Sequence, residues 1–320
     1  MIKVNVQLRL ALDQVLELFP GGMNAPSTVE GRRKLISDLL AAIPHNEAVD
    51  RQDFRCKSFM DESSVAVRMY TPKAGLAFAD SVLMVIHGGG MIMGSLDLDD
   101  ANASQLCQIL GVRVMAVDYR LAPKHVYPAQ IHDCYSAFRW LCQNSAQFNF
   151  DPKKVVLFGG SAGGGLALGT ALFIRDRGET NFSAIMAAYP MLDDRNETAS
   201  SHEILELGVW DRAANIESWN WYLYGKDPSP ISNETIEPYA APARAASLAN
   251  LPPIFIDVGS CDLFRDEDQS FANRLRDAGN SGEFHLYEGA FHASELFAPE
   301  ADLSVTMWEK RYEVLRTWLS

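Results

Sequence analysis

Residues 155–164 read VVLFGGSAGG, and their pattern is the strongest indication of the fold. Four apolar residues lead into a glycine-rich turn with a serine at position 161, and a stretch of helical length and period, residues 163–177, follows directly. The pattern Gly-x-Ser-x-Gly between a strand and a helix is typical of a nucleophile elbow, where the serine projects above a sheet from a strained turn. Glycines at 159 and 163 remove Cβ atoms that would clash there.

A glycine-rich turn between a strand and a helix is also found in nucleotide-binding proteins, and this alternative fails on the residues. A dinucleotide fingerprint needs Gly-x-Gly-x-x-Gly, but Ser161 and Ala162 stand where the pattern starting at Gly159 or Gly160 requires glycine. A P-loop ends in Gly-Lys followed by Ser or Thr, whereas residues 164–166 read GGL. We therefore treat the turn as a candidate nucleophile site.

Short apolar runs alternate with helix-like stretches along most of the chain. The runs suit strands buried on both faces and lie at residues 82–86, 112–117, 155–158, 184–188 and 254–258. The helix-like stretches lie at residues 98–110, 130–144, 163–177 and 265–278. This alternation predicts an α/β fold with a mostly parallel sheet flanked by helices. Upstream, residues 54–60 and 65–70 predict an antiparallel hairpin at the sheet edge.

Two regions stand outside this alternation, residues 1–50 and residues 193–238. The first contains amphipathic helical patterns. The second is dense in aromatic residues, namely Trp210, Trp219, Trp221, Tyr222 and Tyr224. Such a cluster fits either core packing or a cap whose apolar underside faces a pocket. We expect a catalytic domain over 51–192 and 239–320, and a discontinuous helical cap over 1–50 and 193–238.

Composition restricts the partners and the compartment. The 320 residues include 28 Lys and Arg against 41 Asp and Glu, and the formal charge of −13 argues against nucleic acid and acidic membrane surfaces. The five cysteines are scattered and odd in number, which favours reduced thiols. Charged residues interrupt the apolar N-terminal stretch, and no run approaches the roughly 20 apolar residues of a membrane span. We expect a cytoplasmic location.

A hydrolytic serine also needs donors for the oxyanion, a base and an orienting acid. The tract HGGG at residues 87–90 directly follows the expected strand 82–86. Its glycines allow backbone N–H groups to approach a substrate oxygen, and the N–H of Ala162 lies just after the candidate nucleophile. We expect an oxyanion hole from these donors, with His87 in a structural role.

The candidate orienting acid is Asp262, which follows the expected strand 254–258 and so reaches the carboxyl edge of the sheet. Asp257 lies within that strand, and Asp266 begins the following helix. Both are interpreted as structural, with Asp266 as the reserve.

The candidate base is His292, which follows a short expected strand at 284–287. The competing histidines fall within a strand, within a helix, or in loops or the expected cap, namely His285, His132, His45, His125 and His202. The chain order Ser161, Asp262, His292 is the order of the triad in hydrolases with a Gly-x-Ser-x-Gly elbow. This order selects His292.

Taken together, the motifs resemble the hormone-sensitive-lipase-like branch of the α/β-hydrolases, which includes bacterial and fungal carboxylesterases. The resemblance runs from about residue 82 to residue 292. It is carried by residues 87–90, 118–123, 127–129, 159–164, 265–267 and 291–292. It implies the α/β-hydrolase fold with a helical cap. It also implies a homodimer formed through the last strand and the C-terminal helix.

The resemblance assigns the catalytic roles residue by residue. It implies Ser161 as nucleophile, His292 as base and Asp262 as orienting acid. It implies oxyanion donors at Gly89, Gly90 and Ala162. This mechanism requires no metal and no organic cofactor, and the expected partner is a small-molecule ester.

The chain departs from the family pattern around the pocket. Gly160 stands where many members carry Asp or Thr, and Ala293 stands where many carry Gly. Met91 and Met93 replace an aromatic residue that often follows the glycine tract. We expect Met91, Met93 and Trp210 in the pocket wall. Deformable methionines and an aromatic cap favour short or medium acyl esters over long triglycerides.

Two alternatives to a carboxylesterase stay open. The same triad serves amide, lactone or carbamate hydrolysis, which the sequence does not separate from ester hydrolysis. The same branch also includes the plant gibberellin receptor, a binding protein that has lost its catalytic histidine. The presence of His292 favours an enzyme over a receptor.

Overall fold

A computed structural model describes residues 3–18, 28–40, 44–179, 182–205, 207, 209–226 and 235–320. In it, the five apolar runs all belong to one eight-stranded sheet. The strands lie side by side in the order β1-β2-β4-β3-β5-β6-β7-β8. Their bounds are β1 Val49–Lys57, β2 Ser64–Pro72, β3 Phe78–Ile86, β4 Val112–Asp118, β5 Val155–Gly160, β6 Ala184–Ala188, β7 Ile254–Cys261 and β8 Gly282–Phe291.

The strand pairing confirms the predicted α/β class. β1 and β2 form the expected antiparallel hairpin at one edge of the sheet, and β2 is also antiparallel to β4. All other neighbouring strands are parallel. Because parallel strands share their carboxyl edge, the loops after β3, β5, β7 and β8 meet there. In the register of β3 with β5, Ile86 lies opposite Gly159.

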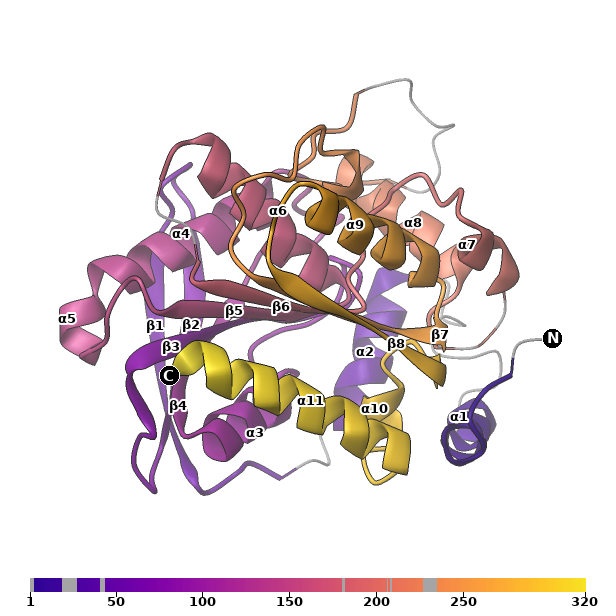
Figure 1. The fold of residues 1–320 in the computed structure, drawn as a ribbon, viewed down its shortest axis with the longest axis horizontal. Helices are drawn as coiled ribbons and strands as arrows, with labels where there is room; N and C mark the ends of the chain where they lie inside the picture. Colours follow the sequence, from indigo (N-terminus) through magenta and orange to yellow (C-terminus); the bar gives the residue numbers. More distant parts are fainter. Residues whose placement is uncertain are drawn as a thin grey trace.

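Helices cover both faces of the sheet (Figure 1). α4 (Ala129–Gln143), α6 (Ala162–Asp176) and α9 (Arg265–Asp277) lie on one face, and α3 (Asp100–Leu110) and α11 (Asp302–Leu319) lie on the other. The remaining helices are α1 Val6–Leu18, α2 Val29–Leu40, α5 Ser145–Phe148, α7 Ala199–Glu203, α8 Arg212–Tyr224, the short 3₁₀ helix Pro242–Arg244 and α10 Ser294–Phe297. No helix among the described residues is long and apolar enough to cross a membrane.

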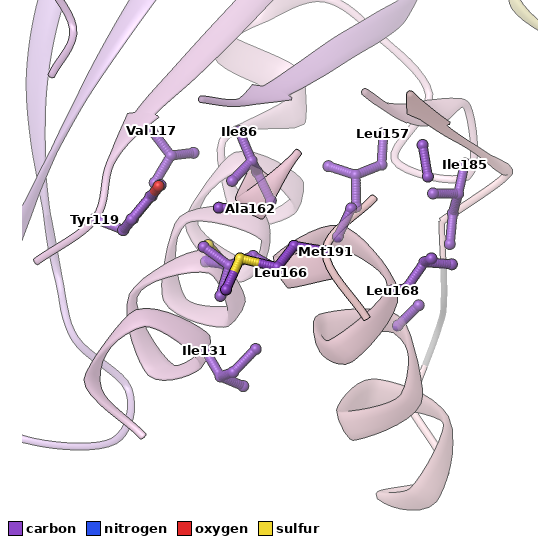
Figure 2. Close-up of a cluster of buried hydrophobic side chains, with 14 of the residues drawn as sticks. Ile86, Val117, Tyr119, Ile131, Leu157, Ala162, Leu166, Leu168, Ile185 and Met191 are labelled. Carbon is purple, nitrogen blue, oxygen red and sulfur yellow. The ribbon is translucent and has the colours of Figure 1, made fainter. Parts of the chain in front are cut away.

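The apolar side chains form a core on each face of the sheet. Figure 2 shows Ile86 and Leu157 of the sheet together with Leu166 of α6, all at most 1% exposed. On the opposite face, Phe158 packs in a second cluster with Leu315 of α11. Fully burying a leucine-sized side chain contributes about 1.5–3 kcal/mol, so both layers of helices fix the central strands firmly.

The two regions outside the alternation contact each other through α2 and α8. Arg32 of α2 pairs with Glu217 of α8 at 2.5 Å, and its guanidinium lies 5.3 Å from the centre of the Trp221 ring. Trp219 and Tyr222 of α8 are buried in the core. Trp210, just before α8, is part of the same core and also lines a cavity. Parts of both regions lie outside the described residues.

Candidate active site

Ser161 lies on the sharp turn between β5 and α6. Its backbone has φ 56° and ψ −124°, a conformation that is strained for a residue with a Cβ. The Ser161 N–H donates to the carbonyl of Ala188 at 2.9 Å, and its carbonyl accepts from the N–H groups of Gly165 and Met191. These bonds stabilise the turn, so the hydroxyl has a fixed position above the sheet.

The two glycines of the motif are required by close backbone contacts. A Cβ on Gly159 would lie 2.3 Å from the carbonyl oxygen of Gly163. A Cβ on Gly163 would lie 2.1 Å from the carbonyl oxygen of Ile86 in the neighbouring strand. Because both contacts are to backbone atoms, neither can be relieved by a side-chain rotation.

The predicted serine, histidine and aspartate meet at the carboxyl edge of the sheet. Nε2 of His292 lies 3.0 Å from Oγ of Ser161, and Nδ1 of His292 lies 2.7 Å from Oδ2 of Asp262. All three residues are buried, and the other carboxylate oxygen of Asp262 accepts the N–H of Phe264 at 3.0 Å. This chain of contacts provides a base next to a hydroxyl, with a carboxylate that fixes the imidazole tautomer.

The two competing aspartates have other partners. Asp257 forms two hydrogen bonds of 2.7 and 3.0 Å with the guanidinium of Arg311. Asp266 accepts the N–H of Ser200 at 2.7 Å and pairs with Arg265. The geometry therefore favours Asp262 over the reserve candidate as the acid next to His292.

A buried polar cluster behind His292 has no signal in the sequence. The edge of the Tyr189 ring packs against the imidazole, with 4.9 Å between ring centres. The Tyr189 hydroxyl donates to Oε1 of Glu295 at 2.7 Å, and the same oxygen accepts from Arg311 at 2.7 Å. The members come from separate elements, so spacing along the chain does not reveal them. Their packing restricts the orientation of the His292 ring.

The glycine tract after β3 lies beside the nucleophile. A Cβ on Gly88 would be 3.5 Å from the Cβ of Ser161. Gly89 and Gly90 have φ values of +103° and +61°, which favour glycine. Within the described part of the chain, the N–H groups of Gly89, Gly90 and Ala162 make no backbone hydrogen bond. These three N–H groups are therefore candidate donors to an oxygen atom of a ligand.

His87 stabilises the glycine tract from behind. Its Nδ1 lies 2.8 Å from the Gly88 carbonyl, and its ring stacks on Tyr119 with 4.1 Å between ring centres. The Tyr119 hydroxyl donates to the His87 carbonyl at 2.9 Å. Burial lowers the pKa of His87 to about 4, so the ring is neutral at pH 7.

A cavity of about 250 Å³ opens onto Ser161 and His292. Most of the side chains around it are apolar, and Met93 and Trp210 lie among them, at the positions expected from the sequence. Met91 does not line the cavity, in contrast to the expectation. Its backbone has φ 60°, and its side chain is fully buried in the core.

No cluster of three or more metal-ligating side chains occurs among the described residues. All five cysteines are unpaired, and four of them are buried.

Comparisons with known proteins identify the family of the chain. Residues 83–296 match the family model described as alpha/beta hydrolase fold. The carboxylesterase NlhH of Mycobacterium tuberculosis is 32% identical over 90% of this chain and 88% of its own length. An arylesterase of Saccharolobus solfataricus is 28% identical over 86% of this chain and 87% of its own length.

The solved structure titled Bacterial Heroin Esterase is 32% identical, with a TM-score of 0.89 over 99% of this chain and 98% of that one. The match is therefore not limited to the catalytic motifs but extends over nearly the whole fold. The chain belongs to the α/β-hydrolase family and is a carboxylic ester hydrolase.

Proposed function

We propose that Ser161 is the nucleophile of a two-step ester hydrolysis through an acyl-enzyme. The observation that carries the proposal is the continuous set of contacts from Ser161 through His292 to Asp262. His292 takes the hydroxyl proton as Oγ forms a bond with the ester carbonyl carbon. The oxygen that becomes negative receives hydrogen bonds from Gly89, Gly90 and Ala162.

The tetrahedral intermediate then expels the alcohol, which takes the proton from His292. A water molecule, deprotonated by the same imidazole, then attacks the carbonyl carbon of the acyl-enzyme. The bond to Oγ breaks, Oγ of Ser161 takes the proton back from His292, and the carboxylic acid is released. Asp262 stabilises the imidazolium that forms in each step and is not itself protonated.

Substitution of the nucleophile tests this mechanism. We expect Ser161→Ala to lower kcat for p-nitrophenyl butyrate by about 10⁴-fold or more, as in other triads of this kind. The exposed Ser281→Ala serves as the matched control and should keep full activity. A fluorophosphonate probe should label the wild-type chain at Ser161. Undiminished hydrolysis by folded Ser161→Ala would exclude the serine mechanism.

For the substrate, we propose short or medium acyl esters. The cavity of about 250 Å³ is slightly smaller than the usual ligand pocket of about 300–1,000 Å³. Its apolar wall suits a small hydrocarbon group. Among p-nitrophenyl esters, kcat/KM should be highest for acyl chains shorter than about eight carbons, because the volume of the cavity is limited. A maximum at long-chain esters would contradict this preference.

We also propose that residues 1–50 and 193–238 form a discontinuous cap over a catalytic domain of residues 51–192 and 239–320. The contacts between α2 and α8 support a single unit, and Ile36 and Trp210, one from each segment, both line the cavity. Trp210→Ala should shift the preferred acyl length upward by removing cap surface. An unchanged length profile would count against a cap that limits the pocket.

We also propose that the chain forms a homodimer and that it is located in the cytoplasm. β8 forms one edge of the sheet, and its Leu286 is 44% exposed, which supports pairing with a second copy. Light scattering at two concentrations tests for the dimer.

The unpaired cysteines support a reducing compartment. Detection of the labelled chain in fractionated cells tests this location.

A further inference from the structure

Asp99 is the only acidic side chain among the described residues that line the active-site cavity. No lysine or arginine lies among those residues, and the neighbouring wall is largely apolar. A carboxyl group in such a place is costly unless it has a partner, because polar groups removed from water need hydrogen bonds. Neither the triad nor the oxyanion donors use this residue.

The hydrogen bonding of Asp99 is incomplete. One carboxyl oxygen accepts from the side-chain amide of Asn102 at 3.2 Å. The other oxygen is buried and has no hydrogen-bond partner in the part of the chain that the structure describes. The residue as a whole is only half-buried, and Asn102 also lines the cavity. Burial raises the pKa of Asp99 to about 7, and the neighbouring Asp100 carboxylate adds to this shift.

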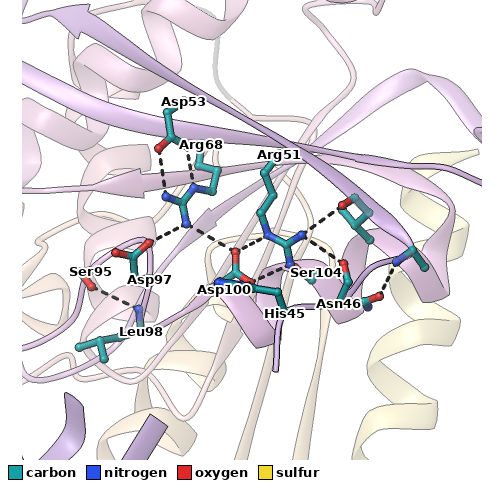
Figure 3. A network of polar contacts seen from close by, with 12 residues as sticks. His45, Asn46, Arg51, Asp53, Arg68, Ser95, Asp97, Leu98, Asp100 and Ser104 are labelled. Carbon is teal, nitrogen blue, oxygen red and sulfur yellow. Dashed lines mark hydrogen bonds and ion pairs between the residues drawn. The ribbon is translucent and has the colours of Figure 1, made fainter. Parts of the chain in front are cut away.

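The residues on either side of Asp99 are anchored by two arginines (Figure 3). Asp97 pairs with Arg68 at 2.8 Å, and Asp100 pairs with Arg51 at 2.7 Å. Arg68 also lies 3.5 Å from Asp100. The segment that presents Asp99 is therefore held in place before any ligand binds, which lowers the cost of using it for recognition.

The three neighbouring aspartates differ in their counter-charges. Asp97 and Asp100 have arginine partners outside the cavity, whereas no ion pair involves Asp99 within the described ranges. The chain also carries a formal charge of −13, which attracts cations toward it. A ligand with a positively charged group in the cavity beside Asp99 would neutralise the charge of its carboxylate.

We propose that Asp99 is a specificity residue that favours carboxylic esters carrying a protonated amine, bound with the ammonium group against the Asp99 carboxylate. The inference rests on the proposed ester hydrolysis and narrows its substrate class.

Pairs of esters that differ only in the charged atom test the proposal. Dimethylaminoethyl acetate and isopentyl acetate place the ammonium group, or the equivalent carbon, in the alcohol. The methyl ester of dimethylaminobutanoic acid and its carbon isostere place it in the acyl chain. Hydrolysis is followed by pH-stat at pH 7, where these amines are protonated. We expect the wild type to prefer the ammonium ester of at least one pair by about tenfold or more in kcat/KM.

Asp99→Asn keeps the shape of the side chain and removes its charge. We expect it to lower the ratio of ammonium ester to isostere by about tenfold to a hundredfold, mainly through KM. Asp277→Asn removes an exposed carboxylate that does not line the cavity, so it is the matched control for net charge and should keep the wild-type ratio.

Two results would overturn the role of Asp99. They are a wild-type ratio near one for both pairs, and an unchanged ratio in folded Asp99→Asn. The wild-type ratios decide even if the variant does not fold. If the proposed ester hydrolysis were itself wrong, the neutral esters would also show no hydrolysis that depends on Ser161, which distinguishes this outcome from a failure of the Asp99 role.

Discussion

Asp268 is a fully buried carboxyl group, and we expect it to make the free energy of unfolding depend strongly on pH. The residue lies on α9 and is 0% exposed, and neither of its oxygens has a hydrogen-bond partner among the described residues. Burial raises its pKa well above the ordinary value, and the nearby carboxylates of Glu267, Asp262 and Asp257 raise it further. The folded chain therefore keeps a proton on Asp268 that the unfolded chain releases above about pH 4.

The sign of the effect on folding follows from this difference. A group whose pKa is higher in the folded state contributes its full stability below the unfolded pKa, and this stability falls as the pH rises toward the folded pKa. The loss approaches about 1.4 kcal/mol per pH unit above the unfolded pKa. Because the unfolded carboxyl is still about half protonated at pH 4, the loss reaches at most about 2.5 kcal/mol between pH 4 and pH 6. Asp268→Asn does not titrate, so its stability relative to the wild type should rise by this amount over the same interval.

Urea unfolding at pH 4, 5 and 6, monitored by tryptophan fluorescence, measures the difference. Asp277→Asn removes an exposed carboxylate from the same helix and should show a nearly constant difference from the wild type. A difference between Asp268→Asn and the wild type that does not change with pH would show that folded Asp268 does not retain its proton, because the residue would then titrate alike in both states.

Three further substitutions test the packing of the site. Gly163→Ala places a Cβ 2.1 Å from the Ile86 carbonyl oxygen and should lower both Tm and kcat, and a variant with normal values for both would disprove that contact. Ala293→Gly relieves a left-handed backbone with φ 56° and should raise stability by about 1 kcal/mol, whereas a fall in Tm would contradict the assigned strain. Arg311→Met leaves two buried carboxylates without their counter-charge and should cost about 3–5 kcal/mol in urea unfolding, so unchanged stability would argue against a buried ion pair.

The central strands were predictable because they are buried on both faces. The apolar run 184–188 coincides with β6, and the run 112–117 differs from β4 by one residue. The bounds of the edge strand β8 were less predictable. The expected strand 284–287 is shorter than β8, Gly282–Phe291, because much of β8 is solvent-exposed and carries polar residues. Exposure removes the apolar signal on which such a prediction depends.

The candidate triad was predictable because each member directly follows a strand, and these three strands end at the same edge of the sheet. The wall of the cavity was not, and Met91 illustrates why. Residues 91 and 93 have the spacing of side chains on one face, but the positive φ of Met91 turns its side chain into the core. The cluster of Tyr189, Glu295 and Arg311 was also missed, because its contacts join elements far apart in the sequence.

The contact between Ser161 and His292 joins positions 131 residues apart. It exists only when β5, β6, β7 and β8 are all paired in register, since the two residues stand at the ends of separate strands. The proposed catalytic contact therefore forms only when the sheet is complete. During refolding, reaction with a covalent serine probe should appear only with the last strand pairing, and the probe would separate chains that have merely collapsed from chains that have assembled.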